Sequence, residues 1–189
     1  CHEQLIRPFE IKNTLVTNGD YNEFLQSKSY NNPSTWLSDG WDWKEKYKIN
    51  NPLYWFKEDD QYFENFFGQR ISLDPNSPVS HISYYEADAY ARFLGQRLPS
   101  EFELELFFQK NDQSPLWTWS SSSYHPYPRF RPFKGFAKEY NGKFMSGQMT
   151  LKGGCIATPN NHYRPSYRNF YRPSDRWQFS GIKLAKDIS

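Results

Sequence analysis

The sequence lacks the features that would assign it to several specialised classes of protein. Its 189 residues include only two cysteines, Cys1 and Cys155, which is too few for a disulfide framework, and we expect both as reduced thiols. The formal net charge is only +2, so no strong electrostatic field favours a nucleic acid or an anionic membrane as partner. No apolar run approaches the ~20 residues that span a bilayer, and no charged-then-apolar signal pattern opens the sequence. These absences predict a cytoplasmic protein.

Leucine, isoleucine and valine are also sparse, whereas aromatic residues make up 20% of the chain. With 13 prolines and 10 glycines as well, this composition predicts a core of rings and loops rather than long leucine-rich helices. No flexible linker divides the sequence, so we expect a single domain over residues 1–189. Because the first residue is cysteine rather than methionine, we also expect the chain to be a fragment, a processed piece or one part of a longer protein.

Three short helices are predicted from capping boxes, in which a hydroxyl accepts from the N3 amide and a carboxylate reaches back to the cap. The pairs are Thr17 with Asp20, Ser83 with Glu86, and Ser100 with Glu103. We expect the second helix to end at Gly95, which permits a left-handed backbone.

Strand-like runs are short and are separated by turn residues. The runs are IKNTLV, MTLKGG and FSGIKLA, while residues 30–80 and 113–148 show neither the helical nor the strand period clearly. The fold class predicted from the sequence is therefore α+β, with low regular content and many loops.

One segment is more specific than the rest. Residues 78–105, PVSHISYYEADAYARFLGQRLPSEFELE, resemble the central block of the formylglycine-generating-enzyme-like fold, also called the sulfatase-modifying-factor domain. The fold is related in architecture to C-type lectins. The block identifies a scaffold and carries no chemistry of its own.

Three further segments narrow the resemblance and, with the first, cover almost the whole chain. They are VTNGDYNEFLQSKSY followed by WLSDGWDW, then SSYHPYPRFRPFKGFAKEYNGKFMSGQM, and finally RPSYRNFYRPSDRWQFSGIKLA. Together they are similar to the C-terminal domain of hercynine oxygenases, the sulfoxide synthases of ergothioneine biosynthesis. The match is closer to these than to formylglycine-generating enzyme or to ovothiol-pathway synthases.

This resemblance implies a function. Members of that family join hercynine to cysteine or γ-glutamylcysteine, using O2 and non-haem Fe(II) held by three histidines in an N-terminal DinB-like domain with an HxxxHxE motif. We therefore expect this chain to be the substrate-binding part of such an oxidoreductase, inactive without an iron-binding domain or chain as its partner.

The metal ligands are not expected in this sequence. Its four histidines, His2, His81, His125 and His162, have no pair at the spacing that places ligands on one helix face. We interpret His81 as a satisfied structural histidine, and His125 and His162 as surface or supporting residues in loops. No catalytic residue is assigned.

The resemblance places the substrate-contacting residues of this domain near the last RNF segment. By position, Asn169, Phe170 and Tyr171 would face the iron and hercynine, and two neighbouring arginines, Arg168 and Arg172, would hold a carboxylate through their planar guanidinium groups. The alternative is that such arginines pin the C-terminal loop by backbone hydrogen bonds. We interpret a third arginine, Arg176, as structural.

Some positions depart from the family pattern. Actinobacterial relatives have a catalytic tyrosine where this chain has Met149, which cannot donate a proton. Cys155 replaces the usual serine after Gly-Gly and is expected as a small buried hydrophobe. Thr118 replaces an acidic residue, which argues against a calcium site in that loop.

Two other hypotheses stay open. The same fold serves as a non-catalytic ligand-binding module, in which Trp36, Trp41, Trp43 and Trp55 would form a sugar or peptide platform, although aromatic residues at this density are usually core. In the second hypothesis, the chain is a degenerate paralogue that only supports the folding or assembly of a partner. The copper-binding cysteine pair of formylglycine-generating enzyme is not recognisable around the two cysteines. The sequence leaves the sulfur donor and the oligomeric state undecided.

Overall fold

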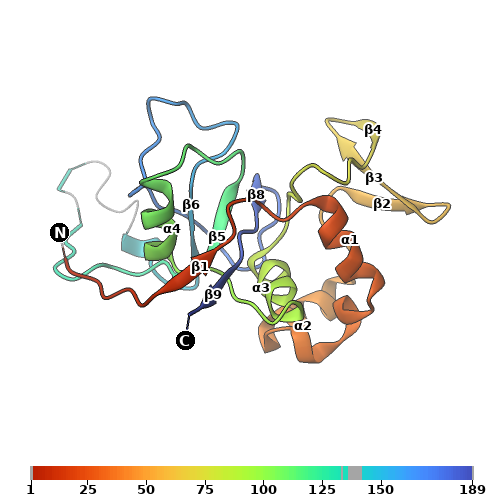
Figure 1. The fold of residues 1–189 in the computed structure, drawn as a ribbon, viewed down its shortest axis with the longest axis horizontal. Helices are drawn as coiled ribbons and strands as arrows, with labels where there is room; N and C mark the ends of the chain where they lie inside the picture. The colour runs from red at the N-terminus through yellow and green to blue at the C-terminus, as the bar shows by residue number, and fades with distance from the viewer. Residues whose placement is uncertain (1, 133, 136–141, 189) are drawn as a thin grey trace.

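The structure is a computed structural model that describes residues 2–132, 134–135 and 142–188 (Figure 1). Within these residues the α-helices are α1 (Asn18–Gln26), α2 (Ser38–Tyr47), α3 (Tyr84–Phe93) and α4 (Glu101–Phe108). Short 3-10 turns are η1 (Ser29–Asn31), η2 (Pro33–Thr35) and η3 (Gly142–Phe144). All the helices are short, as the sequence predicted.

The three predicted capping boxes are present, each with both of its hydrogen bonds, at the N-termini of α1, α3 and α4. The second predicted helix, α3, ends as expected. Gly95 has a φ of +64°, its amide donates to the carbonyl of Arg92, and the amide of Gln96 donates to the carbonyl of Ala91. This is the Schellman pattern, which satisfies carbonyls that the last helical turn leaves without partners.

The described strands form three small sheets. The first pairs β1 (Phe9–Ile11) with β9 (Ala185–Asp187). The second runs in the order β2 (Trp55–Glu58), β3 (Gln61–Phe66), β4 (Gln69–Ser72). The third has the order β7 (Asn169–Tyr171), β6 (Met149–Lys152), β5 (Trp117–Ser123), β8 (Ser180–Gly181), and only its β5–β8 pair is parallel. The predicted α+β class is confirmed.

The elements fall into two neighbouring groups (Figure 1). Helix α4, the third sheet and the β1–β9 pair lie toward the end of the molecule that carries both termini, and α1, α2 and α3 lie toward the other end. The β2–β3–β4 sheet projects beyond α1. This arrangement leaves the tip of the projecting sheet, and much of its surface, open to solvent.

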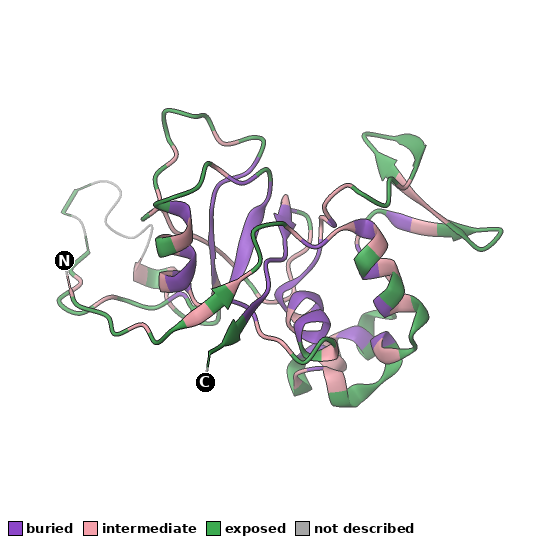
Figure 2. Cartoon of the chain, in the orientation of Figure 1, coloured by how far each residue is buried: buried purple, intermediate pink, exposed green. Residues whose placement is uncertain are grey.

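Buried residues concentrate on β5, β6, β8 and α3, where the two groups meet (Figure 2). Trp119 on β5 is completely buried, and its indole nitrogen donates to the carbonyl of Ile82 at 3.0 Å. Around α1 the core is built of rings: Tyr21 stacks on Tyr90, and Phe24 meets both in edge contacts. The predicted aromatic core is therefore confirmed.

Several local predictions were wrong. The range 30–80 contains α2 and the whole β2–β3–β4 sheet, and residues 113–148 contain β5. Of the run IKNTLV only Ile11 lies in a strand, and FSGIKLA is divided between β8 and β9, whereas MTLKGG forms β6 as expected. Helix α2 was missed because its N-cap, Leu37, makes no side-chain cap and so leaves no local signal.

Gly153, just after β6, provides a test of packing. Its φ is +98°, and an added Cβ would clash with the ring of Phe108. We expect Gly153→Ala to lower the free energy of unfolding by roughly 2–3 kcal/mol, from left-handed strain plus overpacking. Gly68→Ala is the matched control, since Gly68 also has a positive φ but has open space around it. Thermal denaturation of both variants separates the clash from the strain, and equal losses would contradict the packing argument.

Candidate functional site

The segment predicted to contact substrate forms β7, which ends the third sheet on one side. Asn169 lies opposite Leu151 of β6, and Tyr171 lies opposite Met149. Successive side chains of a strand point to opposite faces, so Asn169 and Tyr171 share one face and Phe170 takes the other. The structure thus separates residues that are contiguous in sequence into two environments.

The two faces of β7 differ in chemistry. On one, the Asn169 amide nitrogen lies 3.5 Å from the Tyr171 hydroxyl, and the Tyr171 ring makes an edge contact with the exposed ring of Trp177. On the other, Phe170 stacks on Tyr124 with ring centroids 4.1 Å apart, and Phe144 lies beside it. All three side chains are half-buried, so the two faces differ in polarity, and Phe170 holds the strand against the ring cluster.

Arg168 fixes the beginning of β7 through a buried ion pair. Its Nε lies 2.8 Å from a carboxylate oxygen of Glu101, whose side chain is completely buried at the start of α4. The Arg168 guanidinium is stacked against the rings of Tyr124 and Tyr127, and the Tyr127 hydroxyl donates to the same carboxylate at 2.6 Å. Burial and this hydrogen bond raise the pKa of Tyr127. A substrate carboxylate at Arg168 would have to compete with Glu101.

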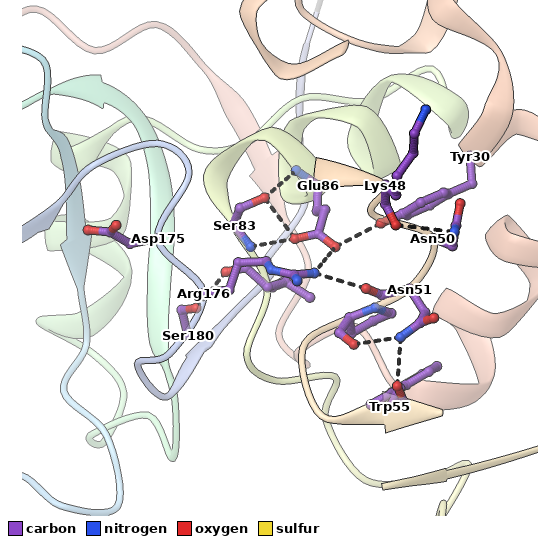
Figure 3. Close-up of polar contacts among 12 residues, drawn as sticks. Tyr30, Lys48, Asn50, Asn51, Trp55, Ser83, Glu86, Asp175, Arg176 and Ser180 are labelled. Atoms are coloured by element: carbon purple, nitrogen blue, oxygen red, sulfur yellow. Dashed lines mark hydrogen bonds and ion pairs between the residues drawn. The ribbon is translucent and has the colours of Figure 1, made fainter. Parts of the chain in front are cut away.

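A second buried pair lies beyond the other end of the strand (Figure 3). Arg176 points its guanidinium toward Glu86 of α3, at 3.3 Å, and donates to the carbonyl of Asn51 at 2.9 Å. The Glu86 side chain is completely buried, and it also accepts from the Tyr30 hydroxyl and from the backbone and hydroxyl of Ser83. Arg176 therefore pins the C-terminal loop, in agreement with its interpretation as structural.

The strand of interest is held between two arginine–glutamate pairs, each anchored in the first turn of a helix. Removing one partner of a buried pair leaves an uncompensated charge, so such pairs resist local rearrangement. Arg172 differs from its neighbours because it is exposed; its backbone amide donates to the Asp175 carboxylate and its backbone carbonyl accepts from the Asp175 amide. Among the described residues, no salt bridge occupies the Arg172 guanidinium.

The histidines do not converge on one point. His125 is exposed, with Nδ1 2.9 Å from the carbonyl oxygen of Ser123, and His162 is exposed against the ring of Tyr167. Across the ranges 2–132, 134–135 and 142–188, no three histidine, cysteine or acidic side chains are grouped closely enough to hold a metal. The described donor set therefore does not fit a non-haem iron centre, which needs several converging ligands.

His81 is only partly what the sequence predicted. It is half-buried at the entrance to α3, with a φ of +57°, but its Nδ1 has no hydrogen-bond partner in the described structure. The backbone of residues 176–178 lies against the ring, and burial lowers the pKa of the imidazole. The ring is held by the backbone around it, as expected of a structural histidine, although Nδ1 itself is without a partner among the described residues.

The burial of the cysteine and tryptophan side chains tests the remaining predictions. Cys155 is buried, as predicted, whereas Cys1 lies outside the described residues. Trp36 and Trp55 are core residues, and Trp41 and Trp43 pack against the core, so the four do not form an exposed ligand platform. That form of the binding-module hypothesis was wrong.

Sequence reasoning missed the partners that position β7. Glu101 and Glu86 are 67 and 90 residues from the arginines they hold. Both glutamates lie in first turns of helices, where acidic residues are common for purely local reasons. The aromatic partners Tyr124 and Tyr127 also precede β7 by more than forty residues, and no periodic signal in the sequence links them to it.

The fold agrees with a comparison to known protein families. Residues 1–109 match the FGE-sulfatase family, described as the sulfatase-modifying factor enzyme 1-like domain. Because the match covers more than half of the chain, the protein belongs to this family, and its formylglycine-generating-enzyme-like fold is confirmed.

Particular relatives are more informative. The chain is 26% identical over 240 aligned positions to a hercynine oxygenase of Mycolicibacterium smegmatis, with all of this chain and 55% of the relative covered. It is 25% identical to ergothioneine biosynthesis protein 1 of Schizosaccharomyces pombe, across 98% of this chain and 26% of the relative. It is also 25% identical to the inactive C-alpha-formylglycine-generating enzyme 2 of Bos taurus, across 86% and 55%.

The chain thus spans about half the length of the hercynine oxygenases that it matches. No helix among the described residues is both long enough and apolar enough to cross a membrane.

Proposed function

We propose that this chain is the substrate-binding part of an iron(II)- and O2-dependent sulfoxide synthase, which joins hercynine to cysteine or γ-glutamylcysteine in ergothioneine biosynthesis. The observation that supports this most is the fixed β7 strand, with Asn169 and Tyr171 on its polar face, in a chain whose whole length aligns with hercynine oxygenases. The proposed setting is the cytoplasm.

The residues of β7 bind and orient in this proposal. The Asn169 side-chain amide, whose oxygen also accepts from the Phe170 amide, and the adjacent Tyr171 hydroxyl would contact the polar groups of hercynine. Arg172, exposed beside them, can take a carboxylate of the amino-acid substrate through its planar fork. Arg168 is assigned a supporting part, since Glu101 already occupies its guanidinium. Phe170 positions the strand through its stack on Tyr124.

The iron would belong to another part of the enzyme, because the described donor set of this chain does not fit it. We therefore assign the metal ligands to a DinB-like domain or chain that packs against β7. Met149, opposite Tyr171, offers no proton, so the acid of the actinobacterial enzymes is not carried over to that position.

Isothermal titration tests this proposal directly. Hercynine is titrated into the chain alone, and into the chain mixed with an Fe(II)-loaded iron-binding domain of a related synthase. We expect binding in the mixture, together with O2 consumption when a thiol is added. Asn169→Ala should weaken hercynine binding by about tenfold, the effect of one lost hydrogen bond of about 1.4 kcal/mol.

Asn160→Ala is the matched control, because Asn160 is an exposed asparagine outside β7. The control should bind as the parent chain does. If the mixture neither binds hercynine nor consumes O2, the oxygenase assignment fails and only the family and fold remain.

The second candidate is a non-catalytic ligand-binding module on the same fold. It is supported by the likeness to a relative that is itself named an inactive enzyme. Binding of hercynine by the chain alone, with no O2 consumption in the mixture, would favour this candidate over the first.

A further inference from the structure

Two adjoining pockets lie between the projecting β2–β3–β4 sheet and the loop that follows β7. Their volumes are ≈ 320 Å³ and ≈ 200 Å³. They share five lining residues, and these are Tyr54, Asn65, Phe66, His81 and Phe179. Because so much of the lining is common to both, the two pockets form one recess, which we call the aromatic recess.

Rings dominate the larger pocket of the aromatic recess, whereas most of the other residues that line the smaller pocket are polar or aliphatic. Tyr54 meets the imidazole of His81 edge-on at 4.9 Å, and Phe179 lies 5.1 Å from the same imidazole. Phe67 and Trp177 complete the larger pocket and are 85% and 61% exposed. Single exposed hydrophobic residues are common on protein surfaces, but several large rings around one open recess form a contiguous apolar patch. Such patches are typical of binding sites.

Glu64 lines the smaller of the two pockets and supplies the one carboxylate of the aromatic recess, next to the five residues that both pockets share. It lies in β3, two residues before Phe66, so the two side chains share a face of the strand. Glu64 is half-buried, and no salt bridge or side-chain hydrogen bond engages it in the described structure. Burial raises the pKa of the Glu64 carboxyl. A partly desolvated carboxylate without a partner is costly, and a cation would relieve that cost.

No lysine or arginine lines either pocket. The titratable side chains that do are Glu64, His81 and Tyr54, and burial lowers the pKa of His81, which favours its neutral form. At neutral pH the aromatic recess therefore combines one negative charge with several aromatic rings. That combination repels anions and attracts organic cations.

We propose that the aromatic recess is a binding site for a small alkylammonium ion, with Glu64 opposite the charge and the rings around its methyl groups. An alkylammonium ion fits the recess better than a metal ion does. A metal ion needs several oxygen ligands, whereas aromatic rings bind the charge and the methyl groups of an alkylammonium ion. The inference does not rest on the proposed function, because none of the residues predicted to bind substrate lines the recess.

The backbone around the recess supports a built site. Tyr54, Phe67 and His81 all have positive φ angles, of 73°, 49° and 57°. Bulky side chains rarely adopt this conformation, and when they do the surrounding structure must hold them. Three such residues on one recess indicate that its backbone is held in place before any ligand arrives, which lowers the entropic cost of binding.

The full chain labelled with 15N is titrated with choline and, separately, with its neutral isostere 3,3-dimethylbutan-1-ol, at constant ionic strength. We expect saturable shifts of the amides around residues 64–68 with choline, and at least about tenfold weaker binding of the neutral isostere. Sodium chloride alone should leave these amides unchanged.

Two variants test the roles of the charge and the rings. Glu64→Gln keeps shape and polarity but removes the charge, and it should weaken choline binding by about tenfold. Trp177→Ala should weaken choline and the neutral isostere together. Glu58→Gln is the control, since Glu58 is an exposed carboxylate of the same sheet, paired with Arg70, and lies outside the recess.

Three results would overturn the proposal: equal binding of choline and the neutral isostere, no saturable shift with millimolar choline, or shifts that follow protein concentration because a second copy covers the recess. None of these depends on hercynine or iron, so each is distinguishable from failure of the proposed function. Binding should also weaken as the solution is acidified through the raised pKa of Glu64, the direction in which the carboxylate is neutralised.

Discussion

Replacing Glu86 by alanine should lower the free energy of unfolding by about 3–5 kcal/mol. The carboxylate is completely buried and accepts hydrogen bonds from Tyr30 and Ser83 while it pairs with Arg176. Its removal leaves a buried guanidinium without its counter-charge and two hydroxyls without their acceptor, and desolvated groups of this kind are expensive. Urea unfolding followed by tryptophan fluorescence measures the loss.

Controls separate the buried network from the general effect of losing a charge. Glu58→Ala breaks an exposed pair with Arg70 and should cost less than about 1 kcal/mol. Glu86→Gln retains the shape and some of the hydrogen bonds, so its loss of unfolding free energy should lie between those of Glu58→Ala and Glu86→Ala. It also keeps the network testable if Glu86→Ala does not fold. The double change Glu86→Leu with Arg176→Met should be less destabilising than the sum of the single changes. A cost below about 1 kcal/mol for Glu86→Ala would contradict the network.

The fold was predictable from the sequence where the determining contacts are local. A capping box is complete within four residues, so the N-termini of α1, α3 and α4 follow from adjacent letters, and Gly95 marks the end of α3 in the same way. Helix α2 has no such signal at Leu37, and it forms because packing in the folded chain, rather than a local cap, stabilises it.

The β2–β3–β4 sheet shows how turn chemistry was overlooked. Its first hairpin turns at Asp59 and Asp60, both with positive φ, which is the type I′ pattern that aspartate tolerates. The second turns at Phe67 and Gly68, also both positive. Phenylalanine is a poor residue for that conformation, so Gly68 alone gave a local signal for this turn.

The candidate site was predictable only as a segment. The family resemblance predicted that the RNF run binds substrate, but the different environments of its residues depend on the alternation of a strand that no local pattern indicated. The position of Arg168 depends on Glu101 of α4 and on two tyrosines, and these contacts join segments that are more than forty residues apart. Residues so distant in sequence meet only after the core has formed.

The second large effect is expected at Glu101, the partner of Arg168. Glu101→Ala should lower the free energy of unfolding by about 3–5 kcal/mol, for the same reason as at Glu86. It should also release Arg168 and the ring cluster that supports Phe170, so that β7 loses its fixed position. A misplacement of about 1 Å can lower the efficiency of a positioned site by up to ~100-fold. We therefore expect the affinity for hercynine in the mixture to fall by more than about tenfold.

Stability and positioning must be separated in this test. Both measurements are made at a temperature where the variant remains folded, and the ring proton shifts of Phe170 report whether its stack on Tyr124 persists. Arg168→Lys keeps the charge near Glu101 but not the planar group that stacks on Tyr124 and Tyr127. This variant should therefore also bind hercynine more weakly than the parent chain. If Glu101→Ala alters stability while the Phe170 shifts and hercynine affinity stay unchanged, Glu101 supports the fold alone, and β7 is held by its pairing with β6 and by Arg176.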